Sequence, residues 1–138
     1  MRITADTNVL LSATFWLGDS FRIIEKVEKG EIELVLSRDI IQEFGGLLEY
    51  DEIKDKIKDK ALEMKKTVDE IVEMSTIVDP KERFNIIKED PEDNVVIECA
   101  VEGKVDYIVS QDDHLLKLKE FRSIRILTPK EMIEILNK

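Results

Sequence analysis

Two kinds of apolar spacing alternate along this chain and divide it into short strands and helices. Runs of aliphatic residues bounded by polar or turn residues predict buried strands. They cover residues 3–5, 31–36, 106–110 and 124–127, and residues 76–79 form a short strand or an extended link. Apolar residues three or four positions apart predict helices over residues 8–14, 20–29, 38–50, 90–102 and 112–117, and from residue 128 onward. Because strands and helices alternate, the pattern predicts an α/β fold with a mostly parallel sheet.

Capping signals mark the start of three of these helices. Ser37 stands where its hydroxyl caps the helix that begins at residue 38. Asp90 is placed as an N-cap, with Pro91 at the first helical position. Thr128 and Glu131 have the spacing of a capping box. These signals fix the helix starts more firmly than the apolar spacing does.

One long amphipathic segment, residues 53–74, departs from the alternation of strands and helices. Its apolar positions recur every three or four residues, and the other positions are mostly Lys, Asp and Glu in mixed order. We therefore expect a helical excursion at about residues 51–75 within a single domain that spans residues 1–138. Such an excursion is suited to contacts with a partner or a second copy.

Length and composition bound the class of protein. The chain has 138 residues, 43% of them hydrophobic, which is enough for one buried core. No apolar run approaches the roughly 18 residues of a membrane span, and the first residues do not resemble a signal peptide. We expect a cytoplasmic protein with no membrane partner. The single histidine, His114, excludes a metal site that needs two imidazoles from one chain, so any metal is held mainly by oxygen, as Mg²⁺ and Mn²⁺ prefer.

The net charge of −10 limits the ways in which this protein can bind nucleic acid. Broad, nonspecific nucleic-acid binding rests on many Lys and Arg contacts to phosphates, and such an acidic chain argues against it. A nuclease remains compatible with this charge, since divalent metal ions supply local positive charge at an acidic site.

Four acidic residues stand where a parallel sheet would bring them to one edge: Asp6, Glu43, Asp93 and Asp112. Asp6 follows the first strand and Asp112 follows the strand ending at Ser110, and open α/β sheets bind ligands at such carboxyl ends. Glu43 falls at the border of the apolar face of its helix, and Asp93 lies on the packed side of a first helical turn. Each also has a simpler explanation, as a helix cap, a first-turn acid or a surface residue. Together they predict a divalent-metal site.

The motifs around these acids resemble those of the PIN-domain nucleases, in particular the branch that forms the toxin components of toxin–antitoxin systems. The motifs follow the family's order over nearly the whole chain: residues 5–10 (ADTNVL), Ser37 with residues 40–44 (IIQEF), 90–94 (DPEDN), 106–116 (DYIVSQDDHLL) and 124–131 (IRILTPKE). The resemblance implies a three-layer α/β/α fold around a central, mostly parallel sheet.

Matched by position, the family's acidic quartet falls on Asp6, Glu43, Asp93 and Asp112, which the resemblance implies are the catalytic and metal-binding residues. Asn8 matches the polar residue of the first motif, and Ser110 matches the hydroxyl residue before the last acid. Asp90 and Asp113 are the nearest alternatives to members of the quartet. The branch usually has Gly where this chain has Gln111, so the backbone there is expected to differ slightly.

The resemblance also implies an activity and its partners. PIN-like enzymes are Mg²⁺- or Mn²⁺-dependent endoribonucleases that cleave single-stranded RNA, commonly form homodimers or higher oligomers, and as toxins pair with a small antitoxin protein. Some of the basic residues of the C-terminal third are expected to flank the crevice and contact phosphates, and the others to be solvated surface residues. These basic residues are Lys104, Lys117, Lys119, Arg122 and Arg125.

Two alternatives belong to other functional classes. A phosphoryl-transfer protein of the haloacid-dehalogenase or receiver type also has aspartates at strand ends, but the phosphatases of the former type need a second Asp two residues after the first, where this chain has Asn8. A catalytically inactive PIN-like module that binds RNA or protein without cutting would retain the same fold. Metal-dependent RNA cleavage separates both alternatives from a nuclease.

Overall fold

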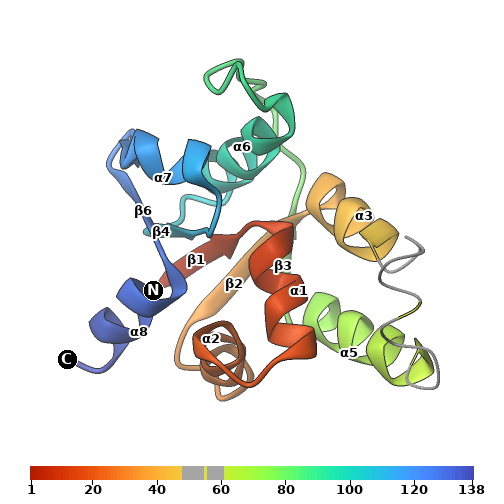
Figure 1. Cartoon of the computed structure of the whole chain (residues 1–138). Helices are drawn as coiled ribbons and strands as arrows, with labels where there is room; N and C mark the ends of the chain where they lie inside the picture. The colour runs from red at the N-terminus through yellow and green to blue at the C-terminus, as the bar shows by residue number, and fades with distance from the viewer. Residues whose placement is uncertain (48–54, 56–60) are drawn as a thin grey trace.

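A six-stranded sheet forms the centre of the computed structural model, which describes residues 1–47, 55 and 61–138 (Figure 1). The strands are β1 (Arg2–Ala5), β2 (Glu33–Ser37), β3 (Thr76–Val78), β4 (Tyr107–Val109), β5 (Glu120–Phe121) and β6 (Ile124–Leu127). Their order is β3-β2-β1-β4-β6-β5. All pairs are parallel except β5 with β6, which confirms the predicted α/β fold.

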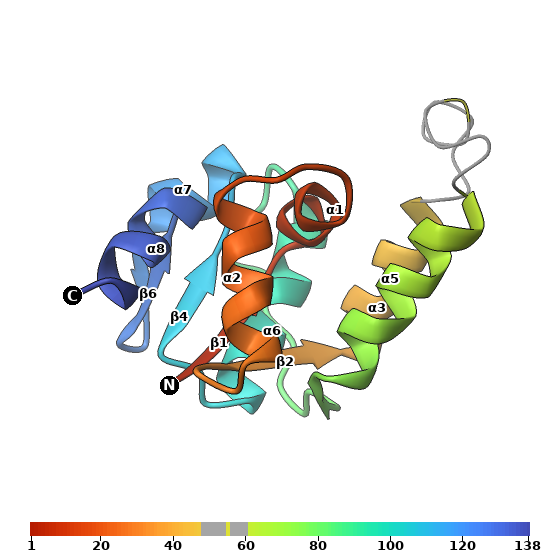
Figure 2. The ribbon, with the colours of Figure 1, turned by 90° about the horizontal axis from the view of Figure 1, so that it is seen from below.

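Helices cover both faces of the sheet, so the fold is a three-layer α/β/α arrangement. The helices are α1 (Thr7–Phe15), α2 (Asp19–Glu28), α3 (Arg38–Leu47), α5 (Ala61–Glu73), α6 (Asn94–Glu102), α7 (Asp113–Leu118) and α8 (Pro129–Leu136). α2 and α8 lie on one face, and α6 and α7 lie on the other (Figures 1 and 2).

The core lies between the sheet and these helices. Ile3, Leu34 and Ile108, from three adjacent strands, are completely buried. Ile23 of α2 and Ile97 of α6 are also buried, from opposite faces of the sheet. Burying such side chains on both faces explains why these strands are nearly continuous aliphatic runs in the sequence.

The order of the strands creates a switch point between β1 and β4. From β1 the chain moves to β2 and then β3 on one side, whereas β4 is followed by β6 on the other side. β1 and β4 pair directly, with Ile3 opposite Tyr107 and Ala5 opposite Val109. The loops after these two strands therefore run in opposite directions and leave a crevice at the carboxyl edge, where open α/β sheets bind ligands.

The structure confirms two of the three predicted helix caps. The Ile40 N–H donates to Ser37 Oγ at 3.3 Å, and the capping box of Thr128 and Glu131 is complete. Asp90 precedes Pro91 as predicted, but the helix begins with a 3₁₀ turn, Pro91–Asp93, and the Asp90 side chain accepts no capping hydrogen bond from it. The Asp90 carboxylate is thereby left to other contacts.

Two regions differ from the prediction or lie outside the described residues. The short strand β5 was not predicted; its connection to β6 consists of Arg122 and Ser123, both with positive φ (49° and 70°), without the Gly that usually marks such a turn. The end of the predicted helix 38–50 and the part of the predicted excursion before residue 61, apart from residue 55, lie outside the described residues. α5 forms the later part of that excursion.

Within the described part of the chain, no helix combines the length and the apolar character needed to cross a membrane.

Candidate functional site

Asp6 joins the end of β1 to the start of α1. Its backbone N–H donates to Val109 O of β4 at 3.2 Å, so the residue is still held by the sheet. Its Oδ1 accepts from the Val9 N–H at 2.9 Å and caps α1, while Oδ2 accepts from Ser110 Oγ. The side chain is therefore both a helix cap and a buried acid, with 5% of its surface exposed. Burial raises the pKa of Asp6, and the hydrogen bonds from Ser110 and Val9 oppose that rise.

Ser110 connects Asp6 to the loop that carries Asp112. The Ser110 side chain is fully buried just after β4, where its hydroxyl donates to Asp6 and accepts from the Asp112 N–H at 2.9 Å. Asp112 is the N-cap of α7, since its Oδ1 accepts from the N–H groups of His114 at 2.8 Å and Leu115 at 3.3 Å. Helix capping thus orients both acids from the two sides of the switch point, and Ser110 ties the two loops together.

Among the acids of this region, Asp93 is the one whose pKa is raised far above its usual value. It ends the 3₁₀ turn before α6, and its side chain is 12% exposed. Its Oδ2 is buried and has no hydrogen-bond partner among the residues that the structure describes. Burial raises the pKa of Asp93 to about 8, with further contributions from the adjacent Asp112 carboxylate and the charges of Asp90 and Asp6. A buried carboxylate oxygen without a donor is costly unless it is protonated or bound to a cation.

Four side chains bring potential ligand atoms together around Asp93. Asp90, Asp93, Asp112 and His114 each offer one such atom, and these atoms lie within 4.8 Å of one another. His114 Nδ1 is 3.7 Å from Asp112 Oδ1 and 4.0 Å from Asp93 Oδ2, distances too long for hydrogen bonds. Atoms that share one small cation at about 2 Å each lie roughly 3–4 Å apart. Three carboxylates and one imidazole therefore fit a divalent cation held mainly by oxygen.

Glu43 approaches the crevice from α3 and is half-buried. Thr7, in the first turn of α1, donates from its hydroxyl to Glu43 Oε1 at 3.2 Å. Burial raises the pKa of Glu43; this hydrogen bond opposes the rise, and the nearby charges of Glu92, Asp6 and Asp90 add to it. Those mutual effects place Glu43 within electrostatic reach of the other acids, although it is outside the group of four around Asp93.

The structure therefore brings only two of the four predicted acids into the group around Asp93. Asp93 and Asp112 belong to the group of four, whereas Asp6 and Glu43 lie beside it and are held by hydroxyl groups. Ser110 makes the contacts expected of a supporting residue. Asn8, the other predicted supporting residue, is exposed and forms no side-chain hydrogen bond with the described residues.

Two residues that lie at the acidic site, His114 and Thr7, were not predicted from the sequence as site residues. His114 was used only to exclude sites with two imidazoles, although its position two residues after Asp112 was a usable signal because histidine is a common metal ligand. Thr7 was treated as part of a polar pair, and its bond to Glu43 depends on how α1 and α3 meet. Asp90, considered only as an alternative, is in the group.

The basic residues do not gather at this crevice as expected. Lys104, Arg122 and Arg125 line a separate pocket of about 510 Å³ at the amino ends of β4 and β6. The acids lie at the opposite, carboxyl ends of the strands. These three residues therefore do not flank the acidic site. Lys104 precedes β4 and Arg122 precedes β6, so their positions in the sequence already place them at the amino ends of two parallel strands.

The loop before α6 is held in place by two buried polar residues of that helix. Asn94 accepts from the N–H groups of Ile86 and Ile87 at 2.9 and 3.0 Å and donates to Ile87 O at 2.9 Å. Glu98 accepts from the Phe84 N–H at 2.9 Å and from Arg83 at 2.8 Å. These bonds replace regular secondary structure over residues 83–87 and lead the chain to Asp90 and Asp93.

Two solved structures resemble this one over almost their whole length. One is VapBC2 from Rickettsia felis, in a structure with a DNA fragment from the promoter of VapBC2. It matches with a TM-score of 0.60 and 12% identity, over 91% of this chain and 97% of that chain. PAE2754 from Pyrobaculum aerophilum matches with a TM-score of 0.58 and 12% identity over the full length of both chains. At such low identity the likeness concerns the fold alone. No curated protein matches the chain.

The sequence itself supplies the assignment to a family. A family model described as PIN domain matches residues 2–114. That match includes β1, the predicted quartet and His114, so it covers both the central strands and every acid of the site described above. The chain belongs to the PIN domain family.

Proposed function

We propose that this protein is a Mg²⁺- or Mn²⁺-dependent endoribonuclease that hydrolyses single-stranded RNA. The observation that carries the proposal is the buried Asp93 Oδ2, which has no partner within the described structure and lies among three further potential ligands. A protein gains nothing by burying such an oxygen unless a proton or a cation satisfies it. At neutral pH a divalent cation can displace the proton and join the group.

In this proposal the quartet Asp6, Glu43, Asp93 and Asp112 holds the metal, and the neighbouring Asp90 or His114 supplies a further ligand. When bound, the cation supplies the positive charge that activates a water molecule and stabilises the departing oxygen of the phosphodiester. No nucleophilic side chain is required.

The remaining residues orient the acids and control their protonation. Ser110 holds Asp6 Oδ2, and the capping bond from Val9 holds Oδ1, so the Asp6 carboxylate keeps one orientation while its burial excludes water. Thr7 holds Glu43 at the other side of the crevice. The high pKa of Asp93 means that this carboxyl holds a proton in the absence of metal and releases it when the cation binds.

We further propose that the protein acts in the cytoplasm as the toxin of a toxin–antitoxin pair, as a homodimer or higher oligomer. Support comes from the motif order in the sequence and from the fold shared with VapBC2 of Rickettsia felis. The proposed partners are single-stranded RNA and a small antitoxin protein. Light scattering of the purified protein tests for the homo-oligomer. The same measurement after adding the product of an adjacent gene tests for the complex with an antitoxin.

The deciding experiment measures cleavage of single-stranded RNA with Mg²⁺, Mn²⁺ or EDTA. We expect cleavage by the wild type with either metal and none with EDTA, and a loss of about 100-fold or more in Asp93→Asn and Asp6→Asn. Asp113→Asn is the matched control, because Asp113 is an exposed acid in the next position after Asp112 and lies outside the group of four.

Equal cleavage by the wild type and Asp6→Asn would contradict the nuclease proposal. RNA binding without metal-dependent cleavage would instead support an inactive RNA-binding module of the same fold. Titration with Mn²⁺ gives a readout that does not depend on activity: Asp93→Asn should weaken Mn²⁺ binding, whereas Asp113→Asn should leave it unchanged.

A further inference from the structure

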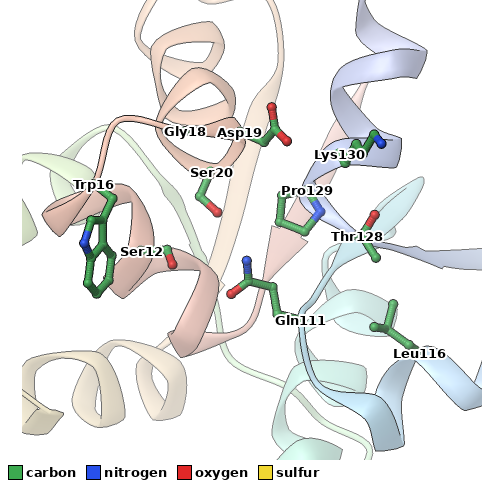
Figure 3. Close-up of a pocket in the computed structure, with 10 residues that line it drawn as sticks. All are labelled: Ser12, Trp16, Gly18, Asp19, Ser20, Gln111, Leu116, Thr128, Pro129 and Lys130. Atoms are coloured by element: carbon green, nitrogen blue, oxygen red, sulfur yellow. The ribbon is translucent and has the colours of Figure 1, made fainter.

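A second pocket opens next to the acids, on the side of α1 and α8. It encloses about 500 Å³ and lies between the end of α1, the start of α2, the loop after β4 and the start of α8 (Figure 3). This volume is within the usual range for small-ligand pockets. The metal-binding candidates are absent from its lining, so the pocket is distinct from the acidic group.

An exposed tryptophan forms one wall of this pocket. Trp16, the only tryptophan of the chain, is 57% exposed. Its ring centroid is 5.4 Å from that of Phe15, and a tilted pair at this distance stabilises the indole in its place. A large aromatic face held open to solvent beside this pocket offers a surface on which a planar ring can stack.

The lining of the pocket mixes apolar side chains with polar ones, and its two charged side chains, Asp19 and Lys130, lie at the starts of α2 and α8. Figure 3 shows the Gln111 amide extending into the space toward the hydroxyl groups of Ser12 and Ser20, with Trp16 beyond Ser12. An amide both donates and accepts hydrogen bonds, and so does a hydroxyl. Lys130 stands on the opposite side, at the start of α8. The amide and hydroxyl groups of this lining match the edge of a heterocyclic base, which carries hydrogen-bond donors and acceptors.

Gln111 also connects this pocket to the acidic site. It lies between Ser110, which holds Asp6, and Asp112, which caps α7. The Gln111 backbone N–H is among the groups that oppose the rise in the pKa of Asp6. The backbone of one residue thus contacts the acidic site while its side chain enters the pocket, so a ligand that fills the pocket lies adjacent to any phosphate bound at the acids.

We propose that this pocket binds one unpaired base of the RNA substrate, adjacent to the phosphate that is cleaved, with Trp16 stacking on the base and Gln111 hydrogen-bonding to its edge. The inference rests on the proposed ribonuclease function and adds a determinant of sequence preference to it. Unpaired bases are commonly recognised by an aromatic face together with polar groups at the base edge. Lys130 is placed to contact the neighbouring phosphate.

The fluorescence of Trp16 provides a direct test, because the protein has no other tryptophan. The titrants are single-stranded RNA pentamers of A, C or U, added with Mg²⁺ to Asp6→Asn, which prevents cleavage under the proposed function. We expect saturable quenching with at least one pentamer and different affinities among the three. Combining Gln111→Ala with Asp6→Asn should weaken binding of the preferred pentamer by about tenfold. It should also reduce the differences in affinity among the three pentamers.

Cleavage kinetics of proteins with an intact acidic site provide the second readout. Trp16→Ala should raise KM by about tenfold with a smaller change in kcat, and Trp16→Phe should restore most of the loss because it keeps an aromatic face. The matched control is Leu17→Ala, since Leu17 is 87% exposed, adjacent to Trp16 and outside the pocket lining. It should leave both readouts unchanged.

The outcomes separate this inference from the function on which it rests. Cleavage by the wild type without any quenching of Trp16 would overturn the base pocket, leave the nuclease proposal standing and assign the exposed indole to a protein contact. Quenching by RNA without cleavage by the wild type would refute the nuclease proposal and leave the base pocket supported. Equal effects of Trp16→Ala and Leu17→Ala would also overturn the pocket.

Discussion

The carboxyl group of Asp93 differs from the other acids of the site because one of its oxygens is buried with nothing to bond to in the described structure. Asp6 and Asp112 both cap helices, so hydrogen bonds satisfy them even without a cation. Asp93 forms no such capping bond, and burial together with the adjacent carboxyl groups of Asp112 and Asp90 raises its pKa to about 8. A divalent cation therefore has its largest effect at this residue.

The raised pKa of Asp93 predicts a pH-dependent stability of the metal-free protein. The unfolded chain ionises this group near pH 3.8, whereas the folded protein holds the proton up to about pH 8. Unfolding releases a proton between these values, so the free energy of unfolding falls as the pH rises through this window. Asp93→Asn removes the effect and should raise Tm relative to the wild type more at about pH 8 than at about pH 5.

Thermal unfolding in EDTA at the two pH values measures this difference. Asp113→Asn is the control, because it removes a neighbouring exposed acid and should shift Tm similarly at both values. If Asp93→Asn and the wild type differ by the same Tm at both pH values, the assignment of the raised pKa to Asp93 is wrong.

Single residues of the site were predictable where the signal was local. Asp6 follows a run of strand residues and Asp112 follows another, so strand ends and a parallel sheet were enough to place both at one edge. The spacing of His114 from Asp112 was a usable signal, but its place beside Asp93 was not predictable, because α6 brings Asp93 there from elsewhere in the chain. Non-local contacts of this kind leave no periodic signal in a sequence.

At the scale of elements, α6 organises one side of the site. It packs against β1, β2 and β4, and its buried Asn94 and Glu98 hold the irregular loop that leads to Asp90. The sequence predicted the helix and an irregular segment over residues 81–89, but not the bonds that hold this loop, since a polar residue within an apolar helix does not reveal which backbone groups it binds. β5 was missed for a related reason: two residues are too few to show alternation, and the turn that follows lacks glycine.

Replacing Asn94 should destabilise the loop and the proposed metal site together. Asn94→Ala leaves the N–H groups of Ile86 and Ile87 without their acceptor, and we expect a loss of about 2–3 kcal/mol in the free energy of unfolding. Mn²⁺ binding should weaken as well, because the loop positions Asp90. Asn137→Ala, at an exposed asparagine, should change stability by less than about 0.5 kcal/mol.

Urea unfolding and Mn²⁺ titration of the two variants provide these measurements. A stable Asn94→Ala protein with unchanged Mn²⁺ affinity would show that the loop does not depend on the Asn94 amide.

Two glycines should respond to alanine in opposite directions. A Cβ at Gly103 would lie 2.6 Å from Val35 Cγ1, where the end of α6 meets β2, so Gly103→Ala should cost about 1–3 kcal/mol. Gly45 lies within α3 with open space around the position of a Cβ, so Gly45→Ala should stabilise by about 0.5–1 kcal/mol through helix propensity. Urea unfolding measures both, and changes of the same sign would contradict this prediction.

The charge of the whole molecule bears on how the proposed RNA substrate would approach it. The net charge is −10, and Lys104, Arg122 and Arg125 lie at the amino ends of the strands, away from the crevice. We therefore expect binding to depend on the bound metal and on stacking rather than on many ionic contacts.

The salt dependence of RNA binding tests that expectation. Between about 50 and 200 mM monovalent salt, proteins that bind through many phosphate contacts lose roughly 10³–10⁵ in affinity. For Asp6→Asn in Mg²⁺, fluorescence anisotropy with labelled single-stranded RNA should show a loss of less than about tenfold over this range. A loss of a thousandfold would indicate an extended basic contact surface.

The segments that carry the acids enter the crevice from positions spread over most of the chain, which has a consequence during synthesis. Ribosomes add about 5–20 residues per second, so Asp112 follows Asp6 by roughly 5–20 s. Until β4 pairs with β1 and Ser110 binds Asp6, nothing holds the two loops together. A nascent chain beside its own messenger RNA therefore lacks the assembled centre until β4 and the loop after it have been synthesised.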